Sequence, residues 1–462
     1  MLTLRLAKLV LETRDIPEAA LDAARNAIID TMGVALAGAV EDCATIAQRW
    51  VKDLGAAPVA TIWGTDLRTS AMDAAFANGI AAHALDFDDS LPTLRGHPST
   101  TMVPAILAAA ESVKVPGRAV LEAYVIGAEV AGMLGKAIGA GHYMRGWHTT
   151  STIGIMSATA AAGRLLGLTA EQLQMAWGIA ASETSGLLCN FGTMTKPFHA
   201  GHAARSALVA VTLVRSGFTA STTIFEGEQN FFSTYAGDDG VPLVELMDSF
   251  GPPWQVLSPS IYVKRWPCCY CNHRPVGGLL KLMAAHNITV DEVKAIRVGF
   301  LPGSDAALLV KGDAARTGLE GKFSIEYCAA ATLLDGKLTL DSFTDAMVQR
   351  PEILPLMGKV ERERIPAEGV YSGVVGYTDI TVETTRGNFD TRVEHTPGSP
   401  QWPMTPSELS EKFLDCATRA LGSNAASKLL AVLEKLPTLP DSASATRLTM
   451  PDKTRTPASA AA

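Results

Sequence analysis

The stretch His83-Ala84-Leu85-Asp86-Phe87-Asp88-Asp89-Ser90, followed shortly by His97-Pro98-Ser99, is the part of this chain from which the rest can be interpreted. It concentrates three carboxylates, two imidazoles and hydroxyl groups in a sequence otherwise rich in alanine and other apolar residues. Ionisable side chains gathered in this way are typical of a functional site. We therefore expect the chain to be organised around this segment.

The quoted stretch is expected to form a bend between two helices. Before it, apolar residues recur at three- and four-residue steps, which predicts a helix over 69–82 with His83 and Asp86 on its last turn. The prolines and the glycine that follow predict a loop, because proline lacks an amide donor and biases its predecessor away from helix. The second helix should begin near Ser99 or Thr100, acting as N-cap.

Length and composition restrict the class of protein. The 462 residues exceed the roughly 250–300 at which a single hydrophobic core stops growing, which favours two domains. Hydrophobic residues make up 47% and charged residues 19%, as expected for a helix-rich soluble enzyme. The net charge of −8 argues against a nucleic-acid partner, which would require a basic patch. A small anionic substrate stays possible, because local charge decides its binding.

The cysteines and the N-terminus bear on the location of the protein. Seven scattered cysteines, an odd number, fit a reducing cytoplasm better than a disulfide framework. Residues 1–16 are amphipathic and contain charged side chains, unlike the apolar region of a signal peptide. No long apolar run free of charge occurs, so we expect no transmembrane helix and no membrane partner.

The pattern along the chain predicts a mainly α protein with an α+β part. Residues up to about 167 read almost wholly as helix, and prolines cluster between 252 and 267. Beyond them, Lys294 to Phe300 alternates as a strand, and two further strands form a predicted hairpin turning at Arg386-Gly387. After Pro403 the helical pattern returns. We expect an all-helical domain from residues 1–265 and 404–450, an α+β domain over 266–403, and a disordered tail over 451–462.

Three further polar groups of residues stand close to apolar helices. His148 follows a Gly-Trp pair, Lys196 and His199 sit in a predicted turn before a helix that begins at Ala203, and Lys264 precedes a cysteine-rich segment. Helix ends that point into one cleft would bring these side chains together with the opening stretch.

Each of these residues also has a structural interpretation, which the sequence leaves open. His83 and His148 could be hydrogen-bonded core or capping residues, and the two lysines could be solvated surface side chains. Asp88 and Asp89 could cap or solvate a loop. Packing explains the remaining candidates equally well: Tyr143, Tyr327 and His202.

Metal-dependent and serine-hydrolase chemistry find little support in the spacing. Cys268, Cys269, Cys271 and His273 have the residue types of a zinc site, but adjacent cysteines do not provide the usual ligand spacing and no second pair follows. The acidic cluster has no second acidic partner of the kind that holds magnesium and diphosphate. A glycine-rich phosphate loop and a G-x-S-x-G elbow are also missing from the sequence. We predict no metal.

Several separated motifs, in this order, make the chain resemble the MmgE/PrpD family. They are His83-x-x-Asp86-Phe-Asp-Asp-Ser90 with His97-Pro-Ser, Gly146-Trp-His148, Thr195-Lys196 with Gly201-x-Ala-Ala204, Lys264-x-x-Pro-Cys-Cys, and Phe323-Ser-Ile-x-Tyr327. The motifs span residues 83 to 327, and the general layout extends over nearly the whole chain. The combination is specific to the family and much less specific to one activity.

The resemblance implies a fold and a set of site residues. It implies a large all-helical domain built from both chain ends, with a smaller inserted α+β lid domain, a homodimer, and no metal or organic cofactor. The implied active-site candidates are Asp86, Ser90, His97, His148, Lys196, Lys264 and Tyr327, to which we add Tyr143 as a catalytic candidate and His83 and His273 as substrate-binding candidates. Ser90 stands where threonine is common, and the loop from Asp86 to His97 is one residue longer than in the decarboxylases of the family.

The chemistry shared by the family is a change of bonding at a carbon next to a carboxylate. Lys196 and Lys264 would clamp substrate carboxylates and stabilise enolate-like charge. His97 and His148 would shuttle the proton, since an unperturbed imidazole has a pKa near about 6.5. Asp86 would orient an imidazole. Tyr327 could donate a proton to the intermediate, and Tyr143 could serve as a second acid or base.

The function expected from this resemblance is a cofactor-independent lyase, a dehydratase or decarboxylase, acting on a small di- or tricarboxylic acid. The first alternative is an isomerase of the iminodisuccinate epimerase type. A non-catalytic carboxylate-binding protein is a second alternative, and a zinc-dependent hydrolase is a remote third. We expect a cytoplasmic enzyme whose partners are its small anionic substrate and a second copy of itself.

Overall fold

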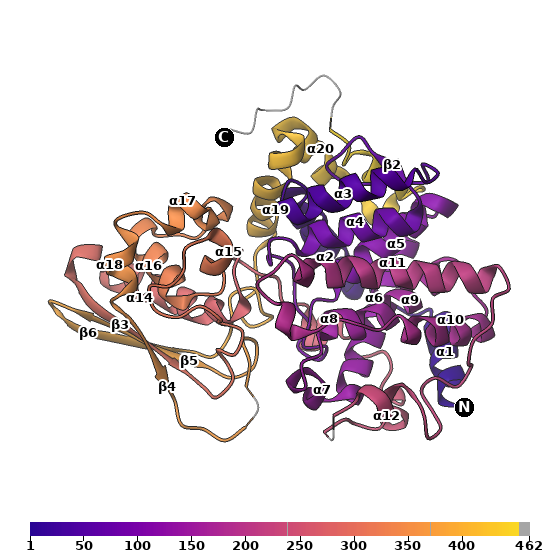
Figure 1. Ribbon diagram of the computed structural model, residues 1–462, viewed down its shortest axis with the longest axis horizontal. Coiled ribbons are helices and arrows are strands. Elements are labelled where there is room, and N and C mark those ends of the chain that lie inside the picture. The colour runs from indigo at the N-terminus through magenta and orange to yellow at the C-terminus, as the bar shows by residue number, and fades with distance from the viewer. Residues whose placement is uncertain (238, 370, 452–462) are drawn as a thin grey trace. The chain divides into compact units, whose positions relative to one another are not determined.

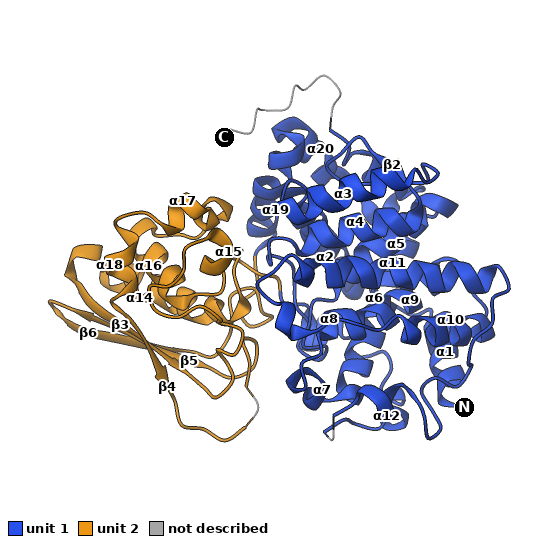
Figure 2. Cartoon of the chain, viewed as in Figure 1, with its two compact units in different colours: residues 1–262, 405–462 blue, residues 263–404 orange. Residues whose placement is uncertain are grey.

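A computed structural model describes residues 1–451 of the chain, apart from residues 238 and 370. The chain divides into two compact units, one formed by residues 1–262 and 405–462 and the other by residues 263–404 (Figure 2). The boundaries expected from the sequence lie close to these division points, although Lys264 falls in the second unit. The predicted disordered tail lies, except for Pro451, outside the described residues.

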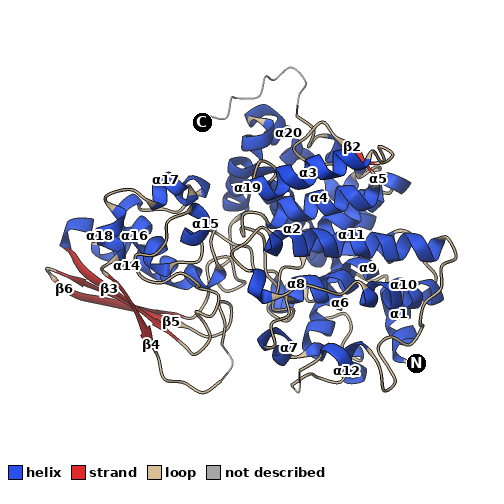
Figure 3. Ribbon diagram, in the orientation of Figure 1, coloured by secondary structure: helices blue, strands red, loops and turns tan. Residues whose placement is uncertain are grey.

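The first unit is helical, with one short pair of strands, β1 (Ala60–Thr61) and β2 (Arg68–Thr69) (Figures 1 and 3). Its helices from the N-terminal segment are α1 (Leu2–Glu12), α2 (Glu18–Gly38), α3 (Asp42–Leu54), α4 (Ala71–His83), α5 (Ser99–Val113), α6 (Gly117–Ile138), α7 (Ala140–Met144), α8 (Thr149–Thr152), α9 (Gly154–Leu165), α10 (Ala170–Ser182), α11 (Thr195–Arg215), α12 (Phe231–Tyr235) and α13 (Leu243–Met247). The C-terminal segment adds α19 (Pro406–Leu421), α20 (Ser423–Leu433) and α21 (Ala443–Arg447).

The second unit combines helices with a four-stranded sheet. Its helices are α14 (His273–His286), α15 (Gly318–Gly321), α16 (Ile325–Asp335), α17 (Asp345–Val348) and α18 (Ile353–Met357). Its strands are β3 (Val293–Phe300), β4 (Val360–Arg364), β5 (Thr378–Thr384) and β6 (Gly387–Val393), in the order β4-β3-β5-β6. The expectation of a mainly α chain with some β structure is therefore confirmed.

The strand predictions for the second unit are confirmed in position. The β5–β6 hairpin pairs Thr384 with Gly387, so the turn residues are Thr385 and Arg386, one position before the predicted Arg386-Gly387. The sequence analysis did not identify β4, which runs parallel to β3 at the edge of the sheet. Four of its five residues are charged and only Val360 is buried, so the strand lacks the alternating apolar pattern by which strands are recognised.

Close helix packing in the first unit brings distant parts of the chain together. Gly79 of α4 faces Gly201 of α11, and a Cβ on Gly79 would lie 2.8 Å from the Cα of Gly201. The missing side chains let the two backbones touch. This crossing places the N-terminal turn of α11, which contains Lys196, beside the segment that follows α4.

The start of α11 differs from the prediction. The helix begins at Thr195 and not at Ala203, so Lys196 and His199 lie within its first two turns. Pro197 is compatible with the earlier start, because the first turn of a helix tolerates proline, whose missing amide would have no intrahelical partner there. The expected N-cap of α5 also differs, because Pro98 occupies that position and the Ser99 hydroxyl bonds elsewhere.

None of the described helices combines the length and the apolar character that crossing a bilayer requires.

We predict that Gly201→Ala destabilises the protein. Alanine normally stabilises a helix interior by about 1 kcal/mol relative to glycine. Here a Cβ would lie 2.4 Å from the carbonyl oxygen of Phe76, so the backbones must separate. We expect the free energy of unfolding to fall by about 1–3 kcal/mol, the usual cost of overpacking, in a urea titration.

The matched control is Gly163→Ala in α9, where the added Cβ would meet only leucine methyl groups at 3.1 Å. Equal unfolding midpoints for the two variants would contradict the account of the α4–α11 contact.

Candidate active site

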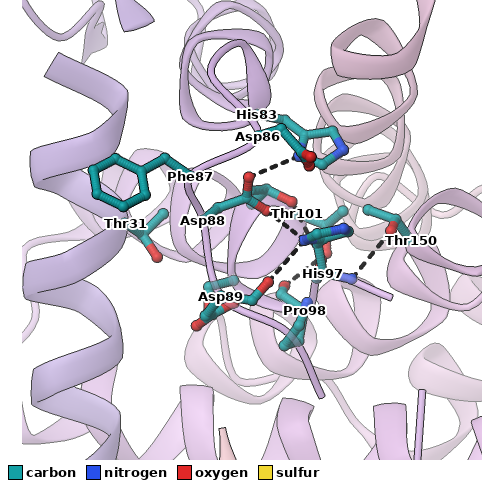
Figure 4. Close-up of polar contacts among 12 residues, drawn as sticks. Thr31, His83, Asp86, Phe87, Asp88, Asp89, His97, Pro98, Thr101 and Thr150 are labelled. Carbon is teal, nitrogen blue, oxygen red and sulfur yellow. Dashed lines mark hydrogen bonds and ion pairs between the residues drawn. The ribbon is translucent and has the colours of Figure 1, made fainter. Parts of the chain in front are cut away.

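The candidate site lies in the first unit, where α4 ends and the chain turns toward α5. His83 is the last residue of α4, and Asp86 adopts the left-handed conformation with φ of 52°. This conformation is uncommon for residues other than glycine, and strained backbone often occurs at functional sites. The turn directs the carboxylates of Asp86 and Asp88 toward the imidazoles rather than toward solvent (Figure 4).

A buried carboxylate holds two imidazoles at the centre of the site. Asp88 is fully buried and accepts a hydrogen bond from Nδ1 of His83 at 2.9 Å, while its other carboxylate oxygen lies 2.8 Å from Nδ1 of His97 (Figure 4). The centres of the two imidazole rings lie 4.7 Å apart. Asp88 therefore fixes the orientation of both rings.

The neighbours of His97 also fix which of its nitrogens carries a hydrogen in the neutral ring. Its Nδ1 lies 2.8 Å from the carbonyl oxygen of Asp89 and 2.8 Å from the Asp88 carboxylate. Both partners are acceptors only, so Nδ1 must be the protonated nitrogen. Nε2 is then left with its lone pair, which is the form required of a general base.

Adjacent carboxyl groups in this loop have opposite pKa shifts. Burial alone would raise the pKa of Asp88, but the charges and hydrogen bonds of His83 and His97 more than offset it and hold the pKa well below its usual range. Burial raises the pKa of Asp89 well above its usual range, despite a hydrogen bond from Ser99 at 2.5 Å. Asp88 is thus the ionised member of the pair.

Lys196 brings a positive charge to the same cluster. Its ammonium donates to Asp86 at 2.6 Å, and both side chains are buried. The same ammonium lies 4.9 Å from the ring centre of Phe191. Asp86 thus holds this lysine, and Asp88 is the carboxylate that contacts the imidazoles of His83 and His97. The expected role of Asp86 in orienting an imidazole stays a prediction.

His148 and His199 complete the imidazole group. The ring of His148 stacks at 5.9 Å from that of His83, and its Nδ1 lies 3.0 Å from Nδ1 of His199. Burial, followed by the charges of His83 and Lys196, holds the pKa of His148 well below its usual range. Both rings are therefore neutral near pH 7.

The loop that carries these residues is anchored from two sides. The amide of His97 donates to the Thr150 hydroxyl at 3.1 Å, and Gly96 allows this approach, since a Cβ there would lie 2.9 Å from Thr150 N. On the other side Lys412 of α19 donates to the Phe87 carbonyl at 3.0 Å and pairs with Asp30 at 2.6 Å. Both chain ends thus help to position the loop.

A divalent cation would find donors here. Ligand atoms of His83, Asp86, Asp88 and His97 lie within 4.8 Å of one another. Asp86 already holds the Lys196 ammonium, and Asp88 accepts from two ring nitrogens. A cation at this position would therefore compete with the lysine and with both histidine contacts.

The remaining candidates lie elsewhere. Ser90 is buried and pairs through its backbone with Tyr262, and Tyr143 lies half-buried on α7. Three further candidates belong to the second unit: Lys264, His273 and Tyr327.

Each of these three second-unit residues is buried. The His273 ring stacks on Tyr270 at 4.8 Å. Tyr327 donates its hydroxyl to the Ser342 carbonyl and packs against Phe343, and burial raises the pKa of its hydroxyl. This environment gives Tyr327 a structural role in its own unit, and its catalytic role stays a prediction.

The sequence assigned no role to two residues of the site. Asp88 fits loop solvation as readily as chemistry, and no local pattern distinguishes it from Asp86 or Asp89. His199 stands in the polar group of Lys196, and its role follows only from the helix: residues three apart share one helical face.

We predict that the protein loses stability as the pH falls from 7 toward 4. Burial lowers the pKa of His83 from 6.5 to about 4, and that of His199 likewise to about 4. Below pH 6.5 these two histidines bind protons in the unfolded chain but not in the folded chain. The stability that the neutral histidines contribute is therefore fully present above pH 6.5 and is lost as the pH approaches 4. The slope is roughly 1.4 kcal/mol per pH unit for each extra proton.

Urea unfolding at pH 7, 6 and 5 measures how steeply the free energy of unfolding depends on pH. In His83→Gln this slope should be smaller by the contribution of one histidine. An unchanged slope in that variant would show that His83 titrates normally in the folded protein.

Comparison with known proteins places the chain in a family. Residues 5–243 match the MmgE/PrpD N-terminal domain and residues 266–437 match the MmgE/PrpD C-terminal domain. The chain is 28% identical to human cis-aconitate decarboxylase, over 90% of this chain and 87% of the human protein, and 28% identical to the mouse enzyme, over 92% and 88%. The cis-aconitate decarboxylase of Aspergillus terreus is 24% identical over 87% of this chain and 86% of its own length. The expectation of a lyase is thereby confirmed, and the chain belongs to the MmgE/PrpD family.

Proposed function

We propose that this chain is a cofactor-independent decarboxylase of a small unsaturated tricarboxylate of the cis-aconitate type. The observation that carries the proposal is the partly buried His97, with Nε2 free of Asp88, together with the buried Lys196 ammonium on Asp86. A proton carrier beside a fixed cation is what decarboxylation requires. The curated relatives of the chain, which are cis-aconitate decarboxylases, support the choice of substrate.

The proposed reaction needs an electron sink and one proton. The bond between the substrate carbon and the departing CO₂ breaks, and its electron pair is delocalised over the alkene and the neighbouring carboxylate. Lys196 stabilises this charge electrostatically. His97 or His148, protonated at Nε2, then delivers the proton that forms the new C–H bond.

The charge of the site sets the pH dependence of substrate binding. Asp86 and Asp88 carry negative charge, balanced in part by Lys196, while burial disfavours protonation of His83 and His148. A polycarboxylate brought beside these rings favours their charged forms and raises their pKa values. Binding therefore takes up protons, and KM should rise with pH above neutrality.

Other parts of the account stay predictions. On the family resemblance we propose catalytic roles for Lys264, Tyr327 and Tyr143, and substrate-binding roles for His273 and Ser90. The homodimer and the cytoplasmic location are proposed on the family resemblance alone.

The direct test is proton NMR in D₂O with cis-aconitate and the EDTA-treated protein. We expect loss of one carboxyl group as CO₂ and a five-carbon unsaturated dicarboxylate carrying one deuterium, at a rate that EDTA does not change. Citrate, 2-methylcitrate and iminodisuccinate serve as comparison substrates.

Deuterium uptake without loss of CO₂ would instead identify an epimerase. A dehydration product from 2-methylcitrate or citrate alone would replace the proposed reaction with a dehydratase. Binding without turnover of any of the four acids would identify a carboxylate-binding protein.

We predict that Asp88→Asn lowers kcat by at least about a hundredfold, within the range that positioned acid–base groups contribute. Each carboxylate oxygen of Asp88 faces one Nδ1, and the amide replaces one of these oxygens with an NH2 donor, so one imidazole must change tautomer or rotate. The measurement is the rate of CO₂ release at saturating substrate.

The matched control is Asp73→Asn on α4, where a largely buried carboxylate binds Arg205 at 3.1 Å and lies outside the cluster. Equal rates in the two variants would contradict the role of Asp88.

A further inference from the structure

The contact between His148 and His199 joins two buried imidazoles through like atoms. Their Nδ1 atoms lie 3.0 Å apart, with both side chains almost completely buried. His148 precedes α8, and His199 lies on the second turn of α11. The two rings are inclined at 57° to each other, with centres 5.3 Å apart.

Surrounding backbone holds the pair in place. The amide of His148 donates to the Gly186 carbonyl at 3.0 Å, and the Ser151 hydroxyl donates to the His199 carbonyl at 3.3 Å. Gly186 has φ of 109°, and a Cβ there would lie 2.9 Å from that of Ser151. The edge of Phe191 packs on the His148 ring, with centres 4.8 Å apart. The geometry is therefore built into the fold and does not rest on one flexible side chain.

An Nδ1-to-Nδ1 contact between neutral imidazoles has a strict chemical consequence. Each neutral ring carries one N–H, so one ring must donate from Nδ1 and the other must accept there. If His148 donates, its Nε2 has a lone pair and can act as a base. If His199 donates, the Nε2 of His148 carries the hydrogen and can act as an acid. The partner thus decides the state of the only other nitrogen of His148.

We infer that His199 is the positioning residue that sets the protonation of His148 and takes the positive charge when His148 binds a proton. When a proton bonds to Nε2 of His148, its Nδ1–H bond breaks and that hydrogen bonds to Nδ1 of His199. His199 becomes the imidazolium and His148 stays neutral. In the reverse direction His148 releases its Nε2 proton to the carbanion, and His199 returns its hydrogen.

The charges around the two rings favour this direction. His148 faces His83 from α4, His97 from the loop after it, and Lys196 from α11, each of which opposes a positive charge on its ring. His199 is opposed by His202 and Lys196. Moving the charge from His148 to His199 therefore takes it away from His83 and His97, while Lys196 opposes it on either ring. This inference rests on the proposed decarboxylation, because it supplies the proton that the reaction consumes.

The test compares His199→Asn with His199→Leu. Asparagine places a hydrogen-bonding atom where Nδ1 lies but cannot become a cation, whereas leucine removes the contact. We expect both variants to reduce kcat with cis-aconitate by at least about tenfold, with KM within about twofold for the asparagine variant, and the pH profile of kcat to shift. His202→Asn, one turn further along α11 and bound to the Glu183 carbonyl at 3.2 Å, should behave as the wild type.

A second readout does not depend on turnover. Long-range ¹H–¹⁵N NMR of the free protein reports which nitrogen of His148 carries the hydrogen. We expect one tautomer of His148 in the wild type and a mixture of tautomers in His199→Leu. If the leucine variant does not fold, the same spectrum is recorded for His199→Asn.

An unchanged His148 spectrum in the variants, or an unchanged kcat and pH profile, would overturn the inference. A wild-type protein that releases no CO₂ from cis-aconitate would reject the proposed function, while the NMR result would still decide whether His199 sets the tautomer of His148.

Discussion

The buried carboxylate of Asp88 is the constraint on which the rest of the site depends. An ionised carboxylate without partners would be strongly disfavoured in such an apolar helical core. It is retained because Nδ1 of His83 donates to one of its oxygens and Nδ1 of His97 lies 2.8 Å from the other. These contacts, with the hydrogen bond of His97 to the Asp89 carbonyl, fix the tautomers of the rings. One requirement of stability, pairing of a buried charge, therefore leaves Nε2 of His97 available to take up the proton that the reaction consumes.

The helical unit is built to hold this carboxylate in place. The loop that contains Asp88 begins with a left-handed residue, Asp86, and ends where Gly96 lets the chain approach α8. Lys412, from the far end of the chain, pairs with Asp30 and donates to the backbone of Phe87. Close contacts between glycine-containing helices bring α11 and its lysine to the same point. Residues far apart in sequence thus converge on one buried group.

Much of the fold and part of the site followed from local patterns. Helical periodicity predicted the end of α4, and alternation predicted the β5–β6 hairpin and, to within one residue, its turn. The density of ionisable residues identified the stretch after His83. These features are local in the sequence, where the spacing of apolar and turn residues is sufficient. The charged edge strand β4 and the proline-containing start of α11 have no such local signature.

The division of roles within the site could not be predicted from the sequence, because it depends on contacts between distant segments. Asp88 and Asp89 are chemically identical neighbours, and only their partners distinguish them: two imidazoles hold one pKa low, and burial raises the other. Likewise Asp86 is committed to Lys196, 110 residues away. The pairing of His148 with His199 depends on the meeting of α8 and α11.

Neutron diffraction on crystals of the free protein grown in D₂O near pH 7 tests the central claim most directly. Our account predicts deuterium on Nδ1 of both His83 and His97, none on the Asp88 carboxylate, and no deuterium on Nε2 of His97. Deuterium on Asp88, or a bare Nδ1 on His97, would contradict it.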